Sequence, residues 1–270
     1  MIGGFILNSI VLMAMLQELL KQYKELGIPD QIDYDKFYLY SLITHSTAIE
    51  GSTITELENQ IMFDEGLTIP GKKIIEQNMN LDLKAAYEKG FWLARNHTPI
   101  SVNLLKDLAG IVMKNTGSEY HTALGDFSSS KGDLRLLNVT AGVGGKSYIS
   151  FTKVAGKLKE FCEWLNERRE HLHEMTEGEI YDLSFKAHYR LVTIHPWADG
   201  NGRMARLLMN MIQVEAGLIP SKVLSTHKLE YIKSLIDTRE QEDQSIFTSF
   251  MTGLLEHQLK EEIEAFKSSI

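Results

Sequence analysis

Apolar residues recur every three to four positions along most of the chain, a spacing typical of amphipathic α-helices. Ser101 and Thr152 each precede such a run and are suitable N-cap residues. The pattern therefore predicts a mainly α-helical fold. The expected helices span residues 11–26, 35–50, 56–65, 74–95, 101–114, 152–169, 177–193, 202–216, 226–238 and 245–266.

The segment LRLLNVTAGVGGKSYISF, residues 134–151, departs from this helical pattern. Two runs rich in β-forming residues, 134–140 and 146–151, flank the glycine-rich stretch AGVGG. Such an arrangement predicts a β-hairpin in an otherwise helical chain. The residues alone leave open whether the hairpin has a function or is only a surface feature.

The composition is that of an ordinary globular protein, with 270 residues, 43% of them hydrophobic, and a net charge of −8. This charge argues against a general nucleic-acid binder, so no nucleic-acid partner is expected, although a local basic pocket is compatible with it. Cys162 is the only cysteine, which excludes an intrachain disulfide and a cysteine-built metal site. It lies in the amphipathic run KLKEFCEWL, where a packing role is expected.

The first residues, MIGGFILNSIVLMAML, are apolar but lack the basic region and cleavage site of a secretory signal. The stretch is also short for a membrane span. We expect a packed or partner-binding helix, a cytoplasmic protein and no membrane association, with a weak export signal as the alternative. The terminal helices, 11–26 and 245–266, could support a homo-oligomer.

The densest group of chemically useful residues is HPWADGNGRMAR, residues 195–206. Gly200 and Gly202 permit a tight turn and close approach to a ligand just before a predicted helix. The free N–H groups and positive dipole at a helix start favour an anion such as phosphate. Arg203 and Arg206 are three residues apart, so both can reach one pocket, and two arginines suit a polyphosphate.

The remaining polar residues of this stretch fit transfer chemistry on a phosphate. Asp199 can provide the one carboxylate with which a phosphate-bound magnesium is often held. His195 can accept a hydroxyl proton near neutral pH, and Asn201 can donate to a phosphoryl oxygen. The stretch therefore predicts attack of a hydroxyl on a metal-bound nucleotide, without indicating which phosphorus atom is attacked.

This stretch resembles the signature of the Fic (filamentation-induced-by-cyclic-AMP) family, H-P-F-x-[D/E]-G-N-G-R-x-x-R, with Trp197 in place of the usual phenylalanine. The preceding KAHYRLVTIHPW is also similar, and we expect its His188 to pack or hydrogen-bond. The resemblance implies a helical bundle with a β-hairpin flap beside the active site. It further implies an N-terminal region (1–95), a catalytic core (96–240) and a C-terminal helix (241–270) packed on the core.

Fic proteins mostly transfer AMP from ATP to a Ser, Thr or Tyr hydroxyl of a target protein. By resemblance, His195 is the general base and Asp199 holds magnesium on the α- and β-phosphates. Asn201 and the backbone of 200–202 form the anion hole, Arg203 binds the phosphate chain, and Arg206 binds the γ-phosphate. Tyr231 resembles the family's aromatic residue near adenine, with a core tyrosine as the alternative.

The predicted hairpin resembles the flap that holds the target segment in Fic proteins by backbone pairing. Gly132 and Arg135 match the start of the family's flap, whereas Leu134 replaces its usual aromatic residue. The residues expected to bind an as yet unidentified target protein are Leu137, Asn138, Val139 and Thr140.

The stretch THSTAIEGST, residues 44–53, resembles the inhibitory motif [S/T]-x-x-x-E-[G/N] of Fic proteins. Ser46 and Glu50 lie four residues apart on one helical face, and Gly51 can end the helix. The resemblance implies that Glu50 pairs with Arg206 in place of the γ-phosphate, and that Ser46 helps to orient Glu50. The alternative is an ordinary helix end with a surface glutamate.

Together these features predict an autoinhibited protein adenylyltransferase that uses ATP and magnesium. One alternative is AMP removal, with Glu50 positioning a water molecule. Another is transfer of a different phosphoryl or nucleotidyl group on the same fold. A third is a nucleotide-binding regulatory module, against which the intact His195 argues.

Overall fold

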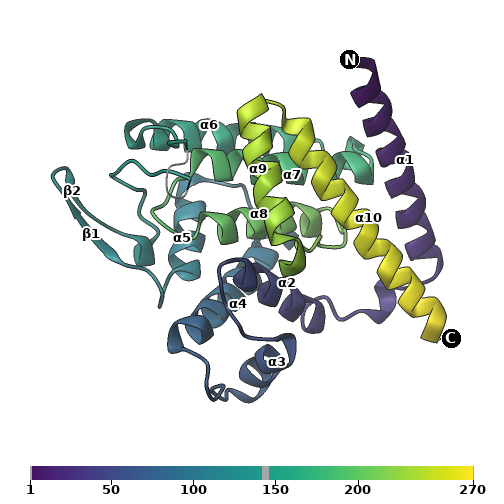
Figure 1. The fold of residues 1–270 in the computed structure, drawn as a ribbon, viewed down its shortest axis with the longest axis horizontal. Helices are drawn as coiled ribbons and strands as arrows, with labels where there is room; N and C mark the ends of the chain where they lie inside the picture. The colour runs from purple at the N-terminus through teal and green to yellow at the C-terminus, as the bar shows by residue number, and fades with distance from the viewer. Residues whose placement is uncertain (1, 142–145, 270) are drawn as a thin grey trace.

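The computed structural model describes residues 2–141 and 146–269, and α-helices dominate them, as predicted (Figure 1). The helices are α1 (Ile2–Glu25), α2 (Phe37–Ile49), α3 (Glu56–Glu65), α4 (Ile74–Arg95), α5 (Val102–Val112), α6 (Phe151–Arg169), α7 (Glu177–Ile194), α8 (Asn201–Glu215), α9 (Lys228–Gln241) and α10 (Gln244–Ser269). The described residues also form short 3-10 helices and two short strands, β1 (Glu119–Thr122) and β2 (Gly125–Ser128).

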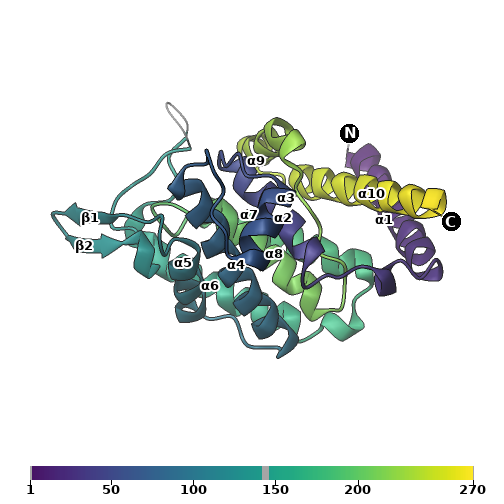
Figure 2. The same ribbon diagram turned by 90° about the horizontal axis from the view of Figure 1, so that it is seen from below.

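Helix α8 lies at the centre of the molecule and packs against α2, α4, α5 and α7. Its apolar stripe, which includes Met204, Leu207 and Met211, is buried in the main hydrophobic core. In both ribbon views the β1–β2 hairpin lies at one end of the molecule, whereas α1 and α10 lie side by side at the other (Figures 1 and 2). The start of α8 is therefore held by its neighbours on several sides.

Helix α1 begins at Ile2, earlier than the predicted start at residue 11, because a helix once formed extends readily through an apolar stretch. Its buried Leu16, Leu20 and Tyr23 join the main core, and α1 contacts α7 and α10. Among the described residues, no helix combines the length and apolar character that a membrane span requires. Cys162 is buried in α6, which confirms its predicted packing role.

The observed β-hairpin is not the predicted one. Strands β1 and β2 pair antiparallel at 119–128, with Glu119 opposite Ser128. In the described part of the flap segment (134–151), the predicted strands are absent and one antiparallel bridge joins Thr140 to Ser147. The turn expected at AGVGG includes residues 142–145, which lie outside the described residues.

Side chains, rather than a regular strand ladder, hold the flap segment in place. Arg135 donates hydrogen bonds to the carbonyls of Leu137 and Ile149, at 2.8 and 2.7 Å. Asn138 accepts one from the backbone N–H of Phe151 at 3.0 Å. These bonds satisfy backbone groups that a sheet would have paired, which explains why β-rich runs did not become strands.

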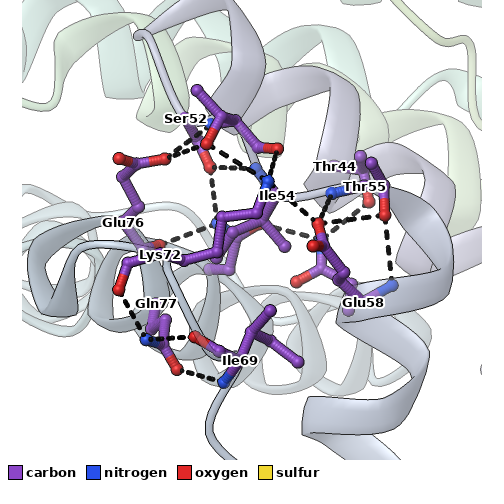
Figure 3. Close-up of polar contacts among 12 residues, drawn as sticks. Thr44, Ser52, Ile54, Thr55, Glu58, Ile69, Lys72, Glu76 and Gln77 are labelled. Atoms are coloured by element: carbon purple, nitrogen blue, oxygen red, sulfur yellow. Dashed lines mark hydrogen bonds and ion pairs between the residues drawn. The ribbon is translucent and has the colours of Figure 1, made fainter.

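A buried polar network fixes the C-terminal end of α2 against α3 and α4. The Asn80 side chain accepts hydrogen bonds from Thr47 (2.8 Å) and Asn59 (2.9 Å) and donates one to Ser52 (3.1 Å). Figure 3 shows the segment that follows α2, including Ser52 and Thr55, among side chains of α3 and α4 such as Glu58 and Glu76. These hydrogen bonds join the last turn of α2 and the residues after it to α3 and α4.

Candidate active site

The loop between α7 and α8 has a backbone that its sequence makes possible. His195 adopts a left-handed conformation (φ 51°) and Gly200 another (φ 82°). The positive φ favours glycine, and a Cβ atom on Gly200 would lie 2.8 Å from Met113 Sδ and displace that side chain. Trp197 is buried and donates from its indole to the Gly132 carbonyl at 3.1 Å. The larger aromatic residue therefore anchors the loop in the core.

The imidazole of His195 is arranged to act as a base. Its Nδ1 lies 3.2 Å from the carbonyl of Val192. Since a carbonyl only accepts, Nδ1 carries the ring proton and Nε2 keeps its lone pair. Burial, partly opposed by the bond to Val192, lowers the pKa of His195 to about 4. The ring is therefore neutral at physiological pH.

The first turn of α8 offers N–H groups to an anion. Its N-cap residue, Gly200, has no side chain to satisfy them. Asn201 instead braces the loop, because its side chain accepts from the Trp197 N–H (3.1 Å) and donates to the Trp197 carbonyl (2.9 Å). Only one of its two amide protons is used there, so the other is available for the predicted bond to a phosphoryl oxygen.

Arg203 is buried, and the groups around it offset its positive charge only in part. It donates to the Val112 carbonyl at 3.3 Å and to Met113 Sδ at 2.9 Å, and the Asp199 carboxylate is 3.9 Å away. Its Nε is buried and has no hydrogen-bond partner among the described residues. Burial lowers the pKa of Arg203, and an additional anion nearby would offset that cost.

Arg206, in contrast, is fully engaged. Its Nη2 donates to Glu50 Oε1 at 2.6 Å and to the Ser46 carbonyl at 3.0 Å, while Nε donates to the Ser46 hydroxyl at 2.8 Å. Burial alone would raise the pKa of Glu50, but the guanidinium of Arg206 holds it below its ordinary value. The carboxylate is therefore ionised at neutral pH and forms a charged pair with Arg206.

The structure brings Ser46 and Glu50 to Arg206, with one change in detail. We expected the Ser46 side chain to help orient Glu50. In the structure its direct hydrogen-bond partner is Arg206. The Ser46 hydroxyl oxygen accepts from the guanidinium, which the Glu50 carboxylate, itself only an acceptor, could not replace as a donor. Gly51 follows the last turn of α2 and donates to the Ala48 carbonyl at 3.0 Å.

A cavity of about 230 Å³ connects these groups. Glu50 lies at one wall, against the first turn of α8: a Cβ atom on Gly202 would come within 2.8 Å of Glu50 Oε1. The cavity is lined by Ile49, Glu50, Tyr148, Val192, His195, Ala198, Asp199, Gly200, Asn201, Gly202, Arg206, Tyr231, Ile232 and Leu235. Polar groups from the loop thus face apolar side chains from α9 across one space.

Asp199 is the carboxylate suited to a metal ion at this site. Its side chain is 61% exposed, and Oδ1 accepts from the N–H of Gly200 at 2.6 Å. The described residues contain no cluster of three or more metal-ligating side chains. A hard cation such as magnesium, which takes one or two carboxylates together with phosphate oxygens and water, fits this donor set.

Comparison with known proteins agrees with the geometry. Residues 99–213 match the model of the Fic/DOC family. The chain is 30% identical over 203 residues to protein adenylyltransferase fic-1 of Caenorhabditis elegans, covering 74% of this chain and 36% of that protein. It is 30% identical over 192 residues to protein adenylyltransferase Fic of Aedes aegypti, covering 70% of this chain and 35% of that protein.

Solved structures show the same architecture. A Fic-1 fragment from C. elegans has a TM-score of 0.76 at 26% identity, over 98% of this chain and 75% of that chain. A Fic-domain signalling protein from Bacteroides thetaiotaomicron has a TM-score of 0.77 at 19% identity, over 94% of this chain and 98% of that chain. This is a Fic/DOC family protein. It has the mainly helical Fic fold with a two-stranded hairpin, and it spans about a third of the length of the curated relatives it matches.

Tyr231 of this Fic protein lies between the cavity and the core. It is 1% exposed, its hydroxyl accepts from Arg206 Nη1 at 3.4 Å, and it lies 2.8 Å from His188 Nε2. His188 is buried and stacks on Phe247, which confirms its packing and hydrogen-bonding role. Burial and the charge of Arg206 lower the pKa of His188 to about 3. Contact of Tyr231 with adenine stays a prediction.

The flap segment lies beside this Fic active site, although its form differs from the prediction. Arg135 joins the two, because its Nε donates to the His195 carbonyl at 2.7 Å while its other nitrogens bond the flap. The Val139 carbonyl accepts from the Tyr148 N–H at 3.0 Å, which leaves part of the backbone of 137–140 committed within the flap. Target binding by these residues stays a prediction.

Two residues of the site were not found from the sequence. Tyr148 stacks on His195, and Arg239 of α9 lies over Tyr148. Both contacts join segments that are far apart in the chain. Neither periodicity nor the residues of the Fic signature indicate them.

Proposed function

We propose that this Fic protein is an autoinhibited protein adenylyltransferase that transfers AMP from ATP to a hydroxyl side chain of another protein. The observation that carries the proposal is the pairing of Glu50 with Arg206 at 2.6 Å in the cavity that also holds the neutral His195. His195 is neutral and can accept a proton, whereas Arg206, which would bind a phosphate of ATP, is bonded to the Glu50 carboxylate. The names of the relatives, protein adenylyltransferases, support the same activity.

The transfer step uses the arrangement of the loop. Nε2 of His195 takes the proton of the target hydroxyl while the hydroxyl oxygen attacks the α-phosphorus of ATP. The bond between the α-phosphorus and the bridging oxygen breaks, and pyrophosphate leaves. Asn201 and the N–H groups at the start of α8 stabilise the charge that develops on the phosphoryl oxygens. Magnesium held by Asp199 would neutralise part of the phosphate charge.

Arg206 links nucleotide binding to inhibition. Its guanidinium suits a terminal phosphate, but it is already bonded to Glu50 and Ser46. ATP that cannot place its γ-phosphate on Arg206 presents its α-phosphorus in the wrong orientation. A misplacement of about 1 Å can cost roughly a hundredfold in rate, so the pair is sufficient to silence transfer.

A second function, removal of AMP from a modified protein, has one observation in its favour. Glu50 Oε2 forms no hydrogen bond with the described residues, and its carboxylate lines the cavity with 33% of the side chain exposed. That oxygen is free to orient a water molecule. Loss of Glu50 would then abolish removal, whereas the same loss would activate transfer.

The proposed transfer is tested by labelling with ATP that carries the label at the α- or the γ-phosphate. Wild type, Glu50→Gly and Glu50→Gly/His195→Ala are incubated with magnesium, and protein-bound label is counted. Glu65→Gly is a matched control, because this exposed glutamate also ends a helix and precedes a glycine. We expect label from α-labelled ATP alone, strong in Glu50→Gly and absent without His195. Label from γ-labelled ATP would instead identify a phosphorylating enzyme.

A further inference from the structure

Tyr148 of the flap segment lies flat against the imidazole of His195. The ring centroids are 3.8 Å apart and the planes differ by 17°, so the rings are stacked face to face. Both side chains line the cavity of the active site. His195 is thus restrained at two points, by this stack and by the bond from Nδ1 to the Val192 carbonyl.

The tyrosine is itself held from α9. The guanidinium carbon of Arg239 lies over the Tyr148 ring, 4.7 Å from its centroid, a distance at which a cation is attracted to an aromatic face. Arg239 also donates to the Lys146 carbonyl at 3.2 Å and to the Ser147 carbonyl. A helix that follows the Fic signature therefore fixes the flap residues immediately before Tyr148.

Arg135 holds the backbone on both sides of the contact between Tyr148 and His195. This one buried guanidinium donates to the His195 carbonyl and to the Ile149 carbonyl, each at 2.7 Å. It therefore ties the backbone of the base to the backbone next to Tyr148. Through Arg239 and Arg135, the relative position of the two rings is set by contacts within the protein.

We propose that Tyr148 is a positioning residue for the catalytic base: its ring holds the imidazole of His195 in the orientation that presents Nε2 to the incoming hydroxyl. The proposal rests on the proposed function. The stack acts through its flat aromatic surface, so phenylalanine can replace tyrosine and an aliphatic side chain cannot. The same contact removes water from one face of the imidazole, in keeping with the neutral state of the ring among Arg135, Asp199 and Arg239.

The first test reads the stack itself by NMR. A ring stacked on an imidazole shifts the carbon-bound protons of that imidazole upfield, and His195→Ala identifies the resonances among those of the nine histidines. We expect the upfield shift in wild type and Tyr148→Phe, and its loss in Tyr148→Leu. An unchanged spectrum in Tyr148→Leu would overturn the proposal. This measurement needs no activity, so it remains decisive even if adenylyl transfer fails.

The second test reads the consequence for transfer in the Glu50→Gly background, with α-labelled ATP as the probe and label on the enzyme as the readout. Tyr148→Leu should lower kcat by about tenfold to a hundredfold through misorientation of the base, with KM for ATP unchanged. Tyr148→Phe should restore kcat. Tyr120→Leu, which removes the stack of Tyr120 on Phe127 in the β1–β2 hairpin, is the matched control and should leave kcat unchanged.

The outcomes separate the two proposals. No label in the Glu50→Gly parent would contradict the proposed function, and the NMR result would then decide the stack alone. A Tyr148→Leu variant as fast as its parent, or faster, would show that Tyr148 does not position the base. A Tyr148→Phe variant as slow as Tyr148→Leu would assign the effect to the hydroxyl and overturn the proposal equally.

Discussion

Glu50 Oε1 lies 2.6 Å from Arg206 Nη2, and both residues line the cavity that contains His195. Arg206 is 3% exposed, so it requires an anionic partner in every state of the protein. A phosphate that takes the place of the Glu50 carboxylate would also be an anionic partner for Arg206. The pair can therefore open without leaving a buried charge alone, provided that a phosphate is at hand.

Replacement of Glu50 by glutamine should strengthen the binding of ATP more than that of AMP. The amide keeps the shape but loses the charge-assisted bond to Arg206, which is worth about 1.5–3 kcal/mol. We expect a gain in ATP affinity of about tenfold to a hundredfold, with little change for AMP, which has no γ-phosphate. Calorimetric titration with both nucleotides measures this, with Glu65→Gln as the control. Equal gains for both would show that Glu50 does not compete with the γ-phosphate.

The free energy of unfolding should decrease as the pH falls below about 6.5. The pKa values of His188 and His195 are lowered in the folded state, to about 3 and about 4. The unfolded chain then binds protons that the folded chain does not, so stability is complete above the ordinary pKa and is lost as the pH falls toward the folded values. The expected slope is about 1.4 kcal/mol per pH unit for each histidine.

Urea unfolding at several values between about pH 7 and pH 5 measures this slope. His188→Phe, which keeps a ring against Phe247, should have a shallower slope than wild type. His173→Phe is the control, since His173 is exposed and should leave the slope unchanged. If the slope is the same in all three proteins, His188 binds its proton equally in the folded and the unfolded state, and its pKa is not lowered by folding.

Loss of the Asn80 side chain should weaken both the fold and the inhibition. Asn80 bonds Thr47, Ser52 and Asn59 in the buried network behind α2, and Asn80→Ala removes these three hydrogen bonds at a cost of about 1–3 kcal/mol. A less well-placed α2 should also release Glu50 in part. We expect a lower urea midpoint and labelling between wild type and Glu50→Gly. Asn96→Ala, at the exposed end of α4, is the control. Lower stability with fully silent transfer would separate the network from the inhibition.

Magnesium should act through Asp199. In the Glu50→Gly background, Asp199→Asn should remove most of the gain in ATP affinity that magnesium provides, since a neutral amide is a weaker ligand than a carboxylate. Titration of ATP with and without magnesium, and with a chelator, measures this gain. Asp126→Asn, an exposed carboxylate on the β1–β2 hairpin, should retain it. A full magnesium effect in Asp199→Asn would place the metal elsewhere.

Much of the fold could be predicted because its determinants are local. Helices α3 and α4 have the predicted bounds, since apolar periodicity marks both in the sequence and a capping box begins α3. The loop at 195–206 was also readable, because its glycines, arginines and carboxylate are close together in the chain. The β1–β2 hairpin was missed because its strands have only four residues each, too few for a clear alternation.

The remainder depends on contacts between distant segments. Arg135 donates to four backbone carbonyls, in the loop that contains His195 and in the flap segment. This one buried arginine therefore fixes the conformation of the flap, where the sequence had predicted two strands. No local sequence pattern predicts the stack of Tyr148 on His195. Similarly, the pairing of Glu50 with Arg206 was expected only through resemblance to the Fic motif, because no local rule relates residues 156 positions apart.

The network behind α2 has a consequence for how the protein responds to its surroundings. Because Glu50 and Arg206 belong to one packed chain, the fraction of molecules in which they are paired is a unimolecular quantity. Under the proposed inhibition, that fraction would shift when a phosphate competes with Glu50 for Arg206, or when binding of another molecule moves α2.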